Sequence, residues 1–235
     1  IAQAQTVGSV FSTDTDPDFN KSNQSKVFYH DGKWWALAVL TGASDWYIWK
    51  FDANTGLWST VILVNTSSSR RPDAVLDASN NRLYVFLSSG SKGEINRYTY
   101  SGGTWALDSG FPVSMSDFGD GGTGNPIGLV QAKNGNLWIF RMASDQLEAK
   151  KSTNNGTTWT SIIIVKTGLN TSTGTADGVA FTNASAQNCV GVAYAETDAS
   201  GSQFGFLVHR DADADNVWTD ETGSLTFAAG ERATN

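Results

Sequence analysis

A tryptophan recurs at the same point of four successive segments of this chain. Trp58, Trp105, Trp159 and Trp218 are separated by 47, 54 and 59 residues. Short stretches of alternating apolar and polar residues surround each of them, a pattern typical of β-strands. A repeat of this length, made of short strands, predicts a β-propeller. In that fold each repeat is a four-stranded sheet, or blade, that cannot bury its faces alone.

Each repeat divides into four expected strands. The first strands are predicted at 25–30, 73–77, 127–132 and 177–182, and the second at 34–40, 83–88, 137–142 and 190–196. The third are predicted at 46–51, 95–100, 147–151 and 204–209, and the fourth begin at the repeating tryptophans. Asp31-Gly32, Asn80-Asn81 and Asn134-Gly135 between first and second strands suit two-residue hairpin turns, which need positive φ. Tryptophan suits the outer strand because blades diverge outward, so we expect these indoles to pack blades together.

The boundaries follow from this division. We expect blades at 21–68, 69–116, 117–168 and 169–227, with an N-terminal segment at 1–20 and a lead-out toward a further blade at 228–235. Residues 5–12 read as a strand without a partner, which could close the last blade. The fold class is therefore all-β, with four visible blades that form part of a larger propeller. A closed ring of four blades is the alternative.

The overall charge limits the classes of partner. The chain has 235 residues with 16 Lys+Arg and a net charge of −7, so it repels phosphate backbones and nucleic-acid binding is disfavoured. No apolar run approaches the roughly 20 residues needed to span a bilayer. The single cysteine, Cys189, reads as a small buried apolar residue. The composition and the small residues at 1–4 favour a secreted protein at the cell exterior or surface.

One loop resembles a known family motif. Ser152-Thr-Asn154-Asn-Gly156-Thr-Thr-Trp159 is similar to the Asp-box, Ser-x-Asp-x-Gly-x-x-Trp, of sialidase-type (BNR-repeat) propellers, with Asn154 in the place of Asp. The polar side chains can bond backbone groups of the turn. The resemblance implies that this loop is a structural element on the side of the propeller opposite to the active funnel.

Strand direction separates two faces of the expected propeller. The loop face holds the starts of the first strands, the loops between second and third strands, and the ends of the fourth. The turn face holds the remaining turns. We expect ligands at the loop face near the axis, where loops of several blades converge, at Lys21, Asn23, Asp45, Arg70, Arg71, Asp73, Asn125, Arg141, Asp145, Asp177 and Glu196, with Lys92 and Glu94 nearby. A polar funnel suits a sugar. Solvated loop charges or axial salt bridges are the alternative.

A catalytic interpretation has fewer matching residues. Arg70-Arg71-Pro72 resembles the Arg-x-Pro element that supplies a carboxylate-clamping arginine in sialidases, although it opens the second repeat here. The remaining sialidase roles would fall to Arg141, Arg210, Tyr194, Glu196 and Asp45, but Arg210 falls toward the turn face and the Tyr194/Glu196 order departs from the family. A glycosidase needs two facing carboxylates, and the loop face offers Asp45, Asp73, Asp145, Asp177 and Glu196 without a spacing that selects a pair.

Two acidic runs could bind calcium, while no other cofactor is expected. Asp211, Asp213 and Asp215 alternate along one loop, as do Asp14, Asp16 and Asp18. Alternate carboxylates can converge on one hard cation. The first run also occupies a turn between third and fourth strands, where Asp is common without a metal.

Three functions are compatible with the sequence. The leading hypothesis is a secreted, non-catalytic binding module that recognises carbohydrate or another surface ligand through its loop face. The second is a glycoside-processing enzyme resembling sialidases, with its remaining catalytic residues outside this segment. The third is a structural or assembly protein, with further blades or another subunit completing the propeller.

Overall fold

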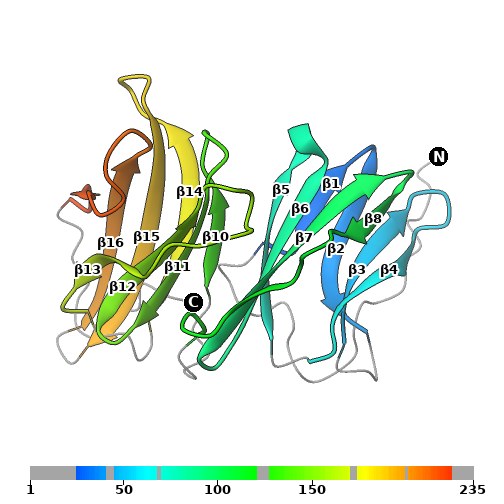
Figure 1. Cartoon of the computed structure of the whole chain (residues 1–235), viewed down its shortest axis with the longest axis horizontal. Helices are drawn as coiled ribbons and strands as arrows, with labels where there is room; N and C mark the ends of the chain where they lie inside the picture. The colour runs from blue at the N-terminus through cyan, green and yellow to red at the C-terminus, as the bar shows by residue number, and fades with distance from the viewer. Residues whose placement is uncertain are drawn as a thin grey trace, which may run out of the picture.

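The fold consists of four antiparallel sheets that follow one another along the chain (Figure 1). A computed structural model describes residues 25–40, 45–67, 70–120, 127–169, 174–198 and 201–223. The first sheet contains β1 (Val27–His30), β2 (Lys33–Val39), β3 (Trp46–Asp52) and β4 (Leu57–Asn65). The second contains β5 (Arg71–Asp77), β6 (Arg82–Ser89), β7 (Lys92–Ser101) and β8 (Thr104–Leu107), with β9 (Val113–Met115) also paired to β7. The third contains β10 (Gly128–Gln131), β11 (Leu137–Ala143), β12 (Gln146–Ser152) and β13 (Ile163–Thr167). The fourth contains β14 (Thr175–Thr182), β15 (Asn188–Asp198), β16 (Gly201–Arg210) and β17 (Thr219–Asp220).

The sheets stand side by side with their first strands innermost. Strand β10 packs against both β5 and β14, so the inner strands of the second, third and fourth sheets are neighbours. This radial order of antiparallel sheets confirms the predicted all-β propeller architecture. The described part of the chain contains no helix whose length and hydropathy would let it cross a bilayer.

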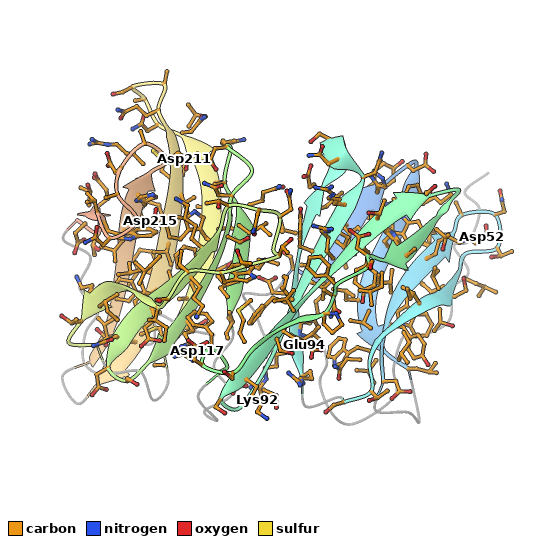
Figure 2. The ribbon with its side chains drawn as sticks, in the orientation of Figure 1. Asp52, Lys92, Glu94, Asp117, Asp211 and Asp215 are labelled. Atoms are coloured by element: carbon orange, nitrogen blue, oxygen red, sulfur yellow. The ribbon has the colours of Figure 1, made fainter. Side chains whose placement is uncertain are left out.

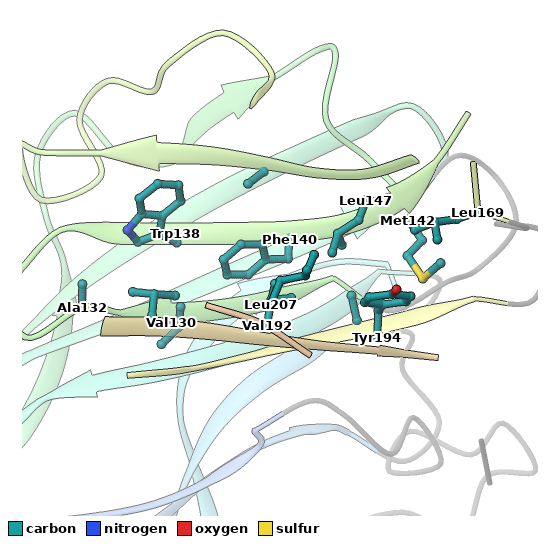
Figure 3. Packing of buried hydrophobic residues seen from close by; sticks show 13 residues of the cluster. Val130, Ala132, Trp138, Phe140, Met142, Leu147, Leu169, Val192, Tyr194 and Leu207 are labelled. Atoms are coloured by element: carbon teal, nitrogen blue, oxygen red, sulfur yellow. The ribbon is translucent and has the colours of Figure 1, made fainter. Parts of the chain in front are cut away.

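Apolar side chains fill the space between successive sheets. The first and second sheets share a cluster that includes Trp35, Ile48 and Leu83, and the second and third share one around Phe118. The third and fourth enclose the cluster of Figure 3, where Trp138 and Phe140 of β11 face the side chains of β15. Each sheet therefore buries its faces only against its neighbours, as expected for repeats that cannot fold alone.

The repeating tryptophans follow the prediction in two sheets and depart from it in two. Trp58 lies in β4 and Trp105 in β8, but β13 begins after Trp159 and β17 after Trp218. In both of these cases the indole N–H donates to the carbonyl oxygen three residues earlier, at 3.1 Å. That local bond holds the tryptophan in a turn, so strand pairing begins only beyond it.

The turns between first and second strands are also mixed. Asp31 and Gly32 have φ values of 50° and 70° and form the predicted two-residue hairpin. The predicted turn at Asn80-Asn81 is instead a short 3₁₀ helix, η1 (Ala78–Asn80). Asp77 caps this helix by accepting a bond from the Asn80 N–H at 3.2 Å. A capping carboxylate thus replaces the tight turn.

Candidate functional site

The two faces separate as the strand order predicts (Figure 2). Lys92 and Glu94, at the start of β7, lie with Asp117 along one edge of the array, while Asp52 and Asp211 lie along the opposite edge. The first edge is the loop face and the second is the turn face. The predicted ligand-binding residues at the starts of the strands therefore belong to the loop face.

Asp73 on the inner strand β5 joins three successive sheets. Its side chain is 2% exposed. Oδ1 accepts the backbone N–H groups of Ser25 at 2.6 Å and Ala74 at 2.9 Å, and Oδ2 accepts that of Leu129 at 2.6 Å. Burial raises the pKa of the Asp73 carboxyl to about 7, although these N–H groups act in the opposite direction. Asp73 thus connects the starts of β1, β5 and β10 through buried hydrogen bonds. Ionisation of its buried carboxyl is unfavourable in the folded chain.

Asp177 on β14 occupies the matching position in the fourth sheet. It is the third residue of its strand, as Asp73 is of β5, and its Oδ1 likewise accepts the next backbone N–H, from Gly178 at 2.8 Å. Asp177 is accessible to solvent, yet the protein around the inner strands removes part of its hydration and raises its pKa. Its negative charge also raises the pKa of Asp73, so the fold brings these two predicted carboxylates close to each other.

A glycine lies where β10 passes close to Asp177. A Cβ atom at Gly128 would lie 3.0 Å from the Asp177 Cα and 3.1 Å from its Oδ1. These distances are tighter than ordinary contacts, so a side chain at residue 128 would require β14 to give by a few tenths of an ångström. The approach of the inner strands therefore depends on this glycine.

Two of the predicted arginines are paired with carboxylates. Arg70 Nη2 lies 3.8 Å from Glu94 Oε2, and Asn65 donates to the other oxygen of the same carboxylate at 2.8 Å. Arg71 Nη1 lies 3.4 Å from the buried Asp120. The charge of both guanidinium groups is therefore largely compensated within the protein.

Arg141 is bound in the same way. Its Nε donates to Glu148 Oε2 at 2.7 Å, directly across the β11–β12 pair, and its Nη1 donates to the Gly119 carbonyl at 3.0 Å. Because Gly119 precedes Asp120, Arg141 and Arg71 bind adjacent residues of the same segment. Arg70, Arg71 and Arg141 are therefore all ion-paired on this face.

The remaining predicted site residues differ in burial and in their place in the fold. Asp145 is exposed in the β11–β12 turn with φ of 58°, and Asp45 is half-buried before β3. Glu196 is buried within β15. Lys21, Asn23 and Asn125 lie outside the described residues. Lys92 is exposed at the start of β7.

Sequence reasoning named Glu94, the partner of Arg70, but missed the partners of Arg71 and Arg141. Glu148 could have been found from the Ser144-Asp145 turn, because a two-residue hairpin places Glu148 opposite Arg141. Asp120 offers no such signal, since it follows β9 in an irregular segment. Asp117 was also missed, and it lies 2.9 Å from Lys150 on β12.

On the turn face, the loop that resembles an Asp-box is held by its own polar groups. Ser152 Oγ accepts the Gly156 N–H at 2.9 Å and donates to Asn154 Oδ1 at 3.0 Å. Asn154 Oδ1 also accepts the Thr158 N–H at 2.9 Å. Trp159 closes the loop against the cluster between the second and third sheets. These contacts give the loop a structural role.

The aspartates of the loop after β16 differ in their contacts. Asp215 forms an ion pair with Lys151 at 2.6 Å, while both carboxylate oxygens of Asp211 are buried without a hydrogen-bond partner. Asp211 and Asp213 border a hollow of about 280 Å³. Within the described residues, no group of three or more His, Cys, Asp or Glu side chains could hold a metal. Lys151 already engages one of the three carboxylates of this loop. Calcium binding by this loop stays a prediction. The 14–18 run lies outside the described residues.

Comparisons with known proteins find solved structures of similar fold. No family model matches the chain, and no curated protein matches it. Among solved structures, the α-L-arabinanase of Penicillium chrysogenum is similar over 92% of this chain and 70% of its own, with a TM-score of 0.53 and 15% identity. The endo-arabinase of Bacteroides thetaiotaomicron covers 89% of this chain and 83% of its own, with a TM-score of 0.50 and 12% identity.

A third similar structure is the NanB sialidase of Streptococcus pneumoniae. It matches 74% of this chain but only 27% of its own length, with a TM-score of 0.51 and 15% identity. At these identities the likeness concerns the fold. It agrees with the radial array of sheets described above.

Proposed function

We propose that this chain is a non-catalytic propeller module that binds carbohydrate through its loop face, as part of a secreted or cell-surface protein. The observation that carries the proposal is that the charged side chains of the loop face are already hydrogen-bonded or ion-paired within the protein. Both oxygens of Asp73 are occupied by backbone N–H groups, and Arg70, Arg71 and Arg141 each have a carboxylate partner. Groups bound in this way hold a surface in shape and have little freedom to transfer protons or clamp an anion.

A neutral polyol suits such a surface. An ion-paired carboxylate keeps lone pairs that accept from hydroxyl groups, and a guanidinium group keeps spare N–H donors. The ligand then needs no net charge to be recognised. The fold is also that of an arabinanase and a sialidase, whose names refer to sugar substrates, which supports carbohydrate as the ligand class.

Calorimetric titration with arabino-oligosaccharides, after a glycan array, tests the proposal. We expect binding by the intact chain, and at least a tenfold weaker affinity (about 1.4 kcal/mol) in Asp177→Asn or Arg71→Ala, because both positions lie at the starts of inner strands. Arg210→Ala on the turn face is the matched control and should bind normally. No binding to any glycan, or equal losses in all three variants, would contradict the assignment.

A sialidase-like glycoside hydrolase of the BNR-repeat type is the second candidate. The observation in its favour is the pair Asp73 and Asp177, two neighbouring inner-strand carboxyls with raised pKa values, which is a common feature of acid–base sites. Turnover of fluorogenic arabinosides or sialosides that disappears in Asp177→Asn would support catalysis. Binding without turnover would support the module.

A further inference from the structure

We propose that the interface between the first and second sheets ends, at the loop face, in a saccharide subsite that binds two neighbouring hydroxyl groups of a neutral sugar. The subsite consists of Trp46, Asn65, Arg70, Glu94 and Asn96, here called the polar layer. The inference rests on the proposed function for its ligand class, and it adds a second site away from the inner strands. It follows from three buried N–H donors of the polar layer that have no acceptor within the described part of the chain.

Two of these donors face each other across the interface. Trp46 begins β3, two residues before Ile48, which packs against the second sheet. Asn96 lies on β7, opposite Val85 and two residues before Tyr98, and both of these residues pack against the first sheet. Side chains two residues apart on a strand share a face. Trp46 and Asn96 therefore point into the same interface, from opposite sheets.

Both donors are buried without a partner. Trp46 and Asn96 are each 2% exposed, and neither Trp46 Nε1 nor Asn96 Nδ2 has a hydrogen bond. Unpaired N–H groups in a protein interior are unfavourable and rare. A ligand that supplies acceptor atoms removes this cost, so the two donors favour binding of such a ligand.

Arg70 supplies the third donor and places it beside an acceptor. Its Nη1 is buried without a partner, whereas its Nη2 lies 3.8 Å from Glu94 Oε2. That separation is longer than a hydrogen bond, so this oxygen can still accept one. Asn65 Nδ2 donates to the other oxygen, Oε1, at 2.8 Å. Because Asn65 lies opposite Trp46 at the end of β4, this bond holds the carboxylate at the same end of the interface.

The other arginine–glutamate pair of the loop face is fully bonded. Arg141 Nε donates to Glu148 Oε2 at 2.7 Å, and Arg141 Nη1 donates to the Gly119 carbonyl at 3.0 Å. Arg70 and Glu94 differ from this pair because they keep a donor and an acceptor for a ligand.

The polar layer fits a neutral diol. A hydroxyl group both donates and accepts hydrogen bonds. One hydroxyl can therefore donate to Glu94 Oε2 and accept from Arg70 Nη1. Its neighbour can accept from Trp46 Nε1 or Asn96 Nδ2. The charges of Arg70 and Glu94 compensate each other, so a uronate or an amino sugar gains no net attraction.

The ligand reaches the polar layer from the loop face. The side chains of Arg70 and Glu94 are 21% and 16% exposed, and Figure 2 shows Glu94 at the loop-face edge of the array. An ion pair at this separation and exposure is weak, so the guanidinium group can turn outward and admit hydroxyl groups. Strand β7 is two strands away from the inner strand β5, which separates the subsite from Asp73.

Nuclear magnetic resonance of the indole N–H groups in the intact chain tests this subsite. The resonance of Trp46 is assigned by its absence from Trp46→Phe. We expect it to move downfield when a sugar from a neutral panel of arabinose, galactose, glucose and arabinotriose is added, because Nε1 gains an acceptor. Galacturonate and galactosamine should bind about tenfold more weakly than the best neutral sugar.

Asn96→Leu separates binding from folding. The change removes an unpaired donor and keeps the volume of the side chain, so the free energy of unfolding should stay the same or rise. The affinity for the same sugar, measured by calorimetry, should fall about tenfold. Glu94→Gln should weaken neutral sugars by a similar factor and favour galacturonate, because Arg70 then has no compensating charge. Asn216→Leu, an exposed change on the turn face, is the matched control and should bind normally.

Three results would overturn the subsite. The first is a Trp46 resonance that no sugar of the panel moves. The second is an affinity that stays unchanged in both Asn96→Leu and Glu94→Gln. The third is a lower free energy of unfolding in Asn96→Leu, which would show that Nδ2 is paired in the folded chain.

Asp177→Asn keeps this test distinct from that of the proposed function. Binding that is lost in Asp177→Asn but kept in Asn96→Leu and Glu94→Gln would overturn the subsite alone. Binding that is lost in Asn96→Leu but kept in Asp177→Asn would support the subsite and contradict a site at the inner strands.

Discussion

At the scale of single residues, Asp73 has two opposing demands. Three backbone N–H groups need its oxygens as acceptors, which favours the carboxylate, while burial disfavours the charge. Burial prevails and the pKa rises. The same residue that fixes the starts of three strands therefore makes the stability of the propeller depend on pH.

The first prediction is a loss of stability as the pH rises through the range in which Asp73 ionises. The pKa of Asp73 is about 7 in the folded chain, against an ordinary value of 3.8 for an aspartate carboxyl. Between these values the folded state binds more protons than the unfolded state, so the free energy of unfolding falls with rising pH. The shift corresponds to roughly 4 kcal/mol over this range. Urea denaturation at a series of pH values measures it.

Asp73→Asn separates this contribution from that of other carboxylates. Asn keeps one acceptor oxygen but turns an amide N–H₂ toward a backbone N–H, so we expect a cost of about 1–3 kcal/mol at pH 4. That cost should shrink as the pH rises, because only the wild-type chain acquires a buried charge. A constant difference between the two proteins from pH 4 to pH 8 would show that Asp73 does not titrate there.

At the scale of single elements, the β12–β13 loop is expected to be stable through one buried hydroxyl. Ser152 is 1% exposed and its Oγ bonds both Gly156 and Asn154. Ser152→Ala leaves a buried N–H without an acceptor, so the free energy of unfolding should fall by about 1–3 kcal/mol. Thr157→Ala removes an exposed hydroxyl of the same loop and should cost less than about 0.5 kcal/mol. Chemical denaturation measures both changes. Equal losses of unfolding free energy in Ser152→Ala and Thr157→Ala would show that Ser152 has no special role in the stability of the loop.

Elements could be predicted from the sequence where their cause is local. Alternation and the Asp31-Gly32 turn define the first hairpin, and they are visible in the residues themselves. The ion pair of Arg71 with Asp120 joins residues 49 positions apart, and only the packing of the sheets brings them together. Trp159 was wrong as a strand start for a different and local reason, because its indole N–H donates to the Gly156 carbonyl of the preceding turn and not to a neighbouring strand. The sequence therefore named Glu94, the partner of Arg70, but not the partners of Arg71 and Arg141.

At the scale of the whole molecule, stability is expected to vary along the array of sheets. Each apolar cluster joins two successive sheets, as repeats in solenoids join only their neighbours. A defect in one cluster then weakens the two sheets that share it more than the distant ones.

Leu83→Ala tests this last prediction. Leu83 is 0% exposed between the first and second sheets, and its truncation should cost about 2–5 kcal/mol. Hydrogen exchange should then accelerate mainly in β2 and β6, while β15 keeps its protection. Val192→Ala, in the cluster of the third and fourth sheets, should give the reverse order because β15 contributes to that cluster. Uniform acceleration in both variants would mean that the four sheets open together, and that the inner-strand bonds made by Asp73 couple them more strongly than the apolar clusters divide them.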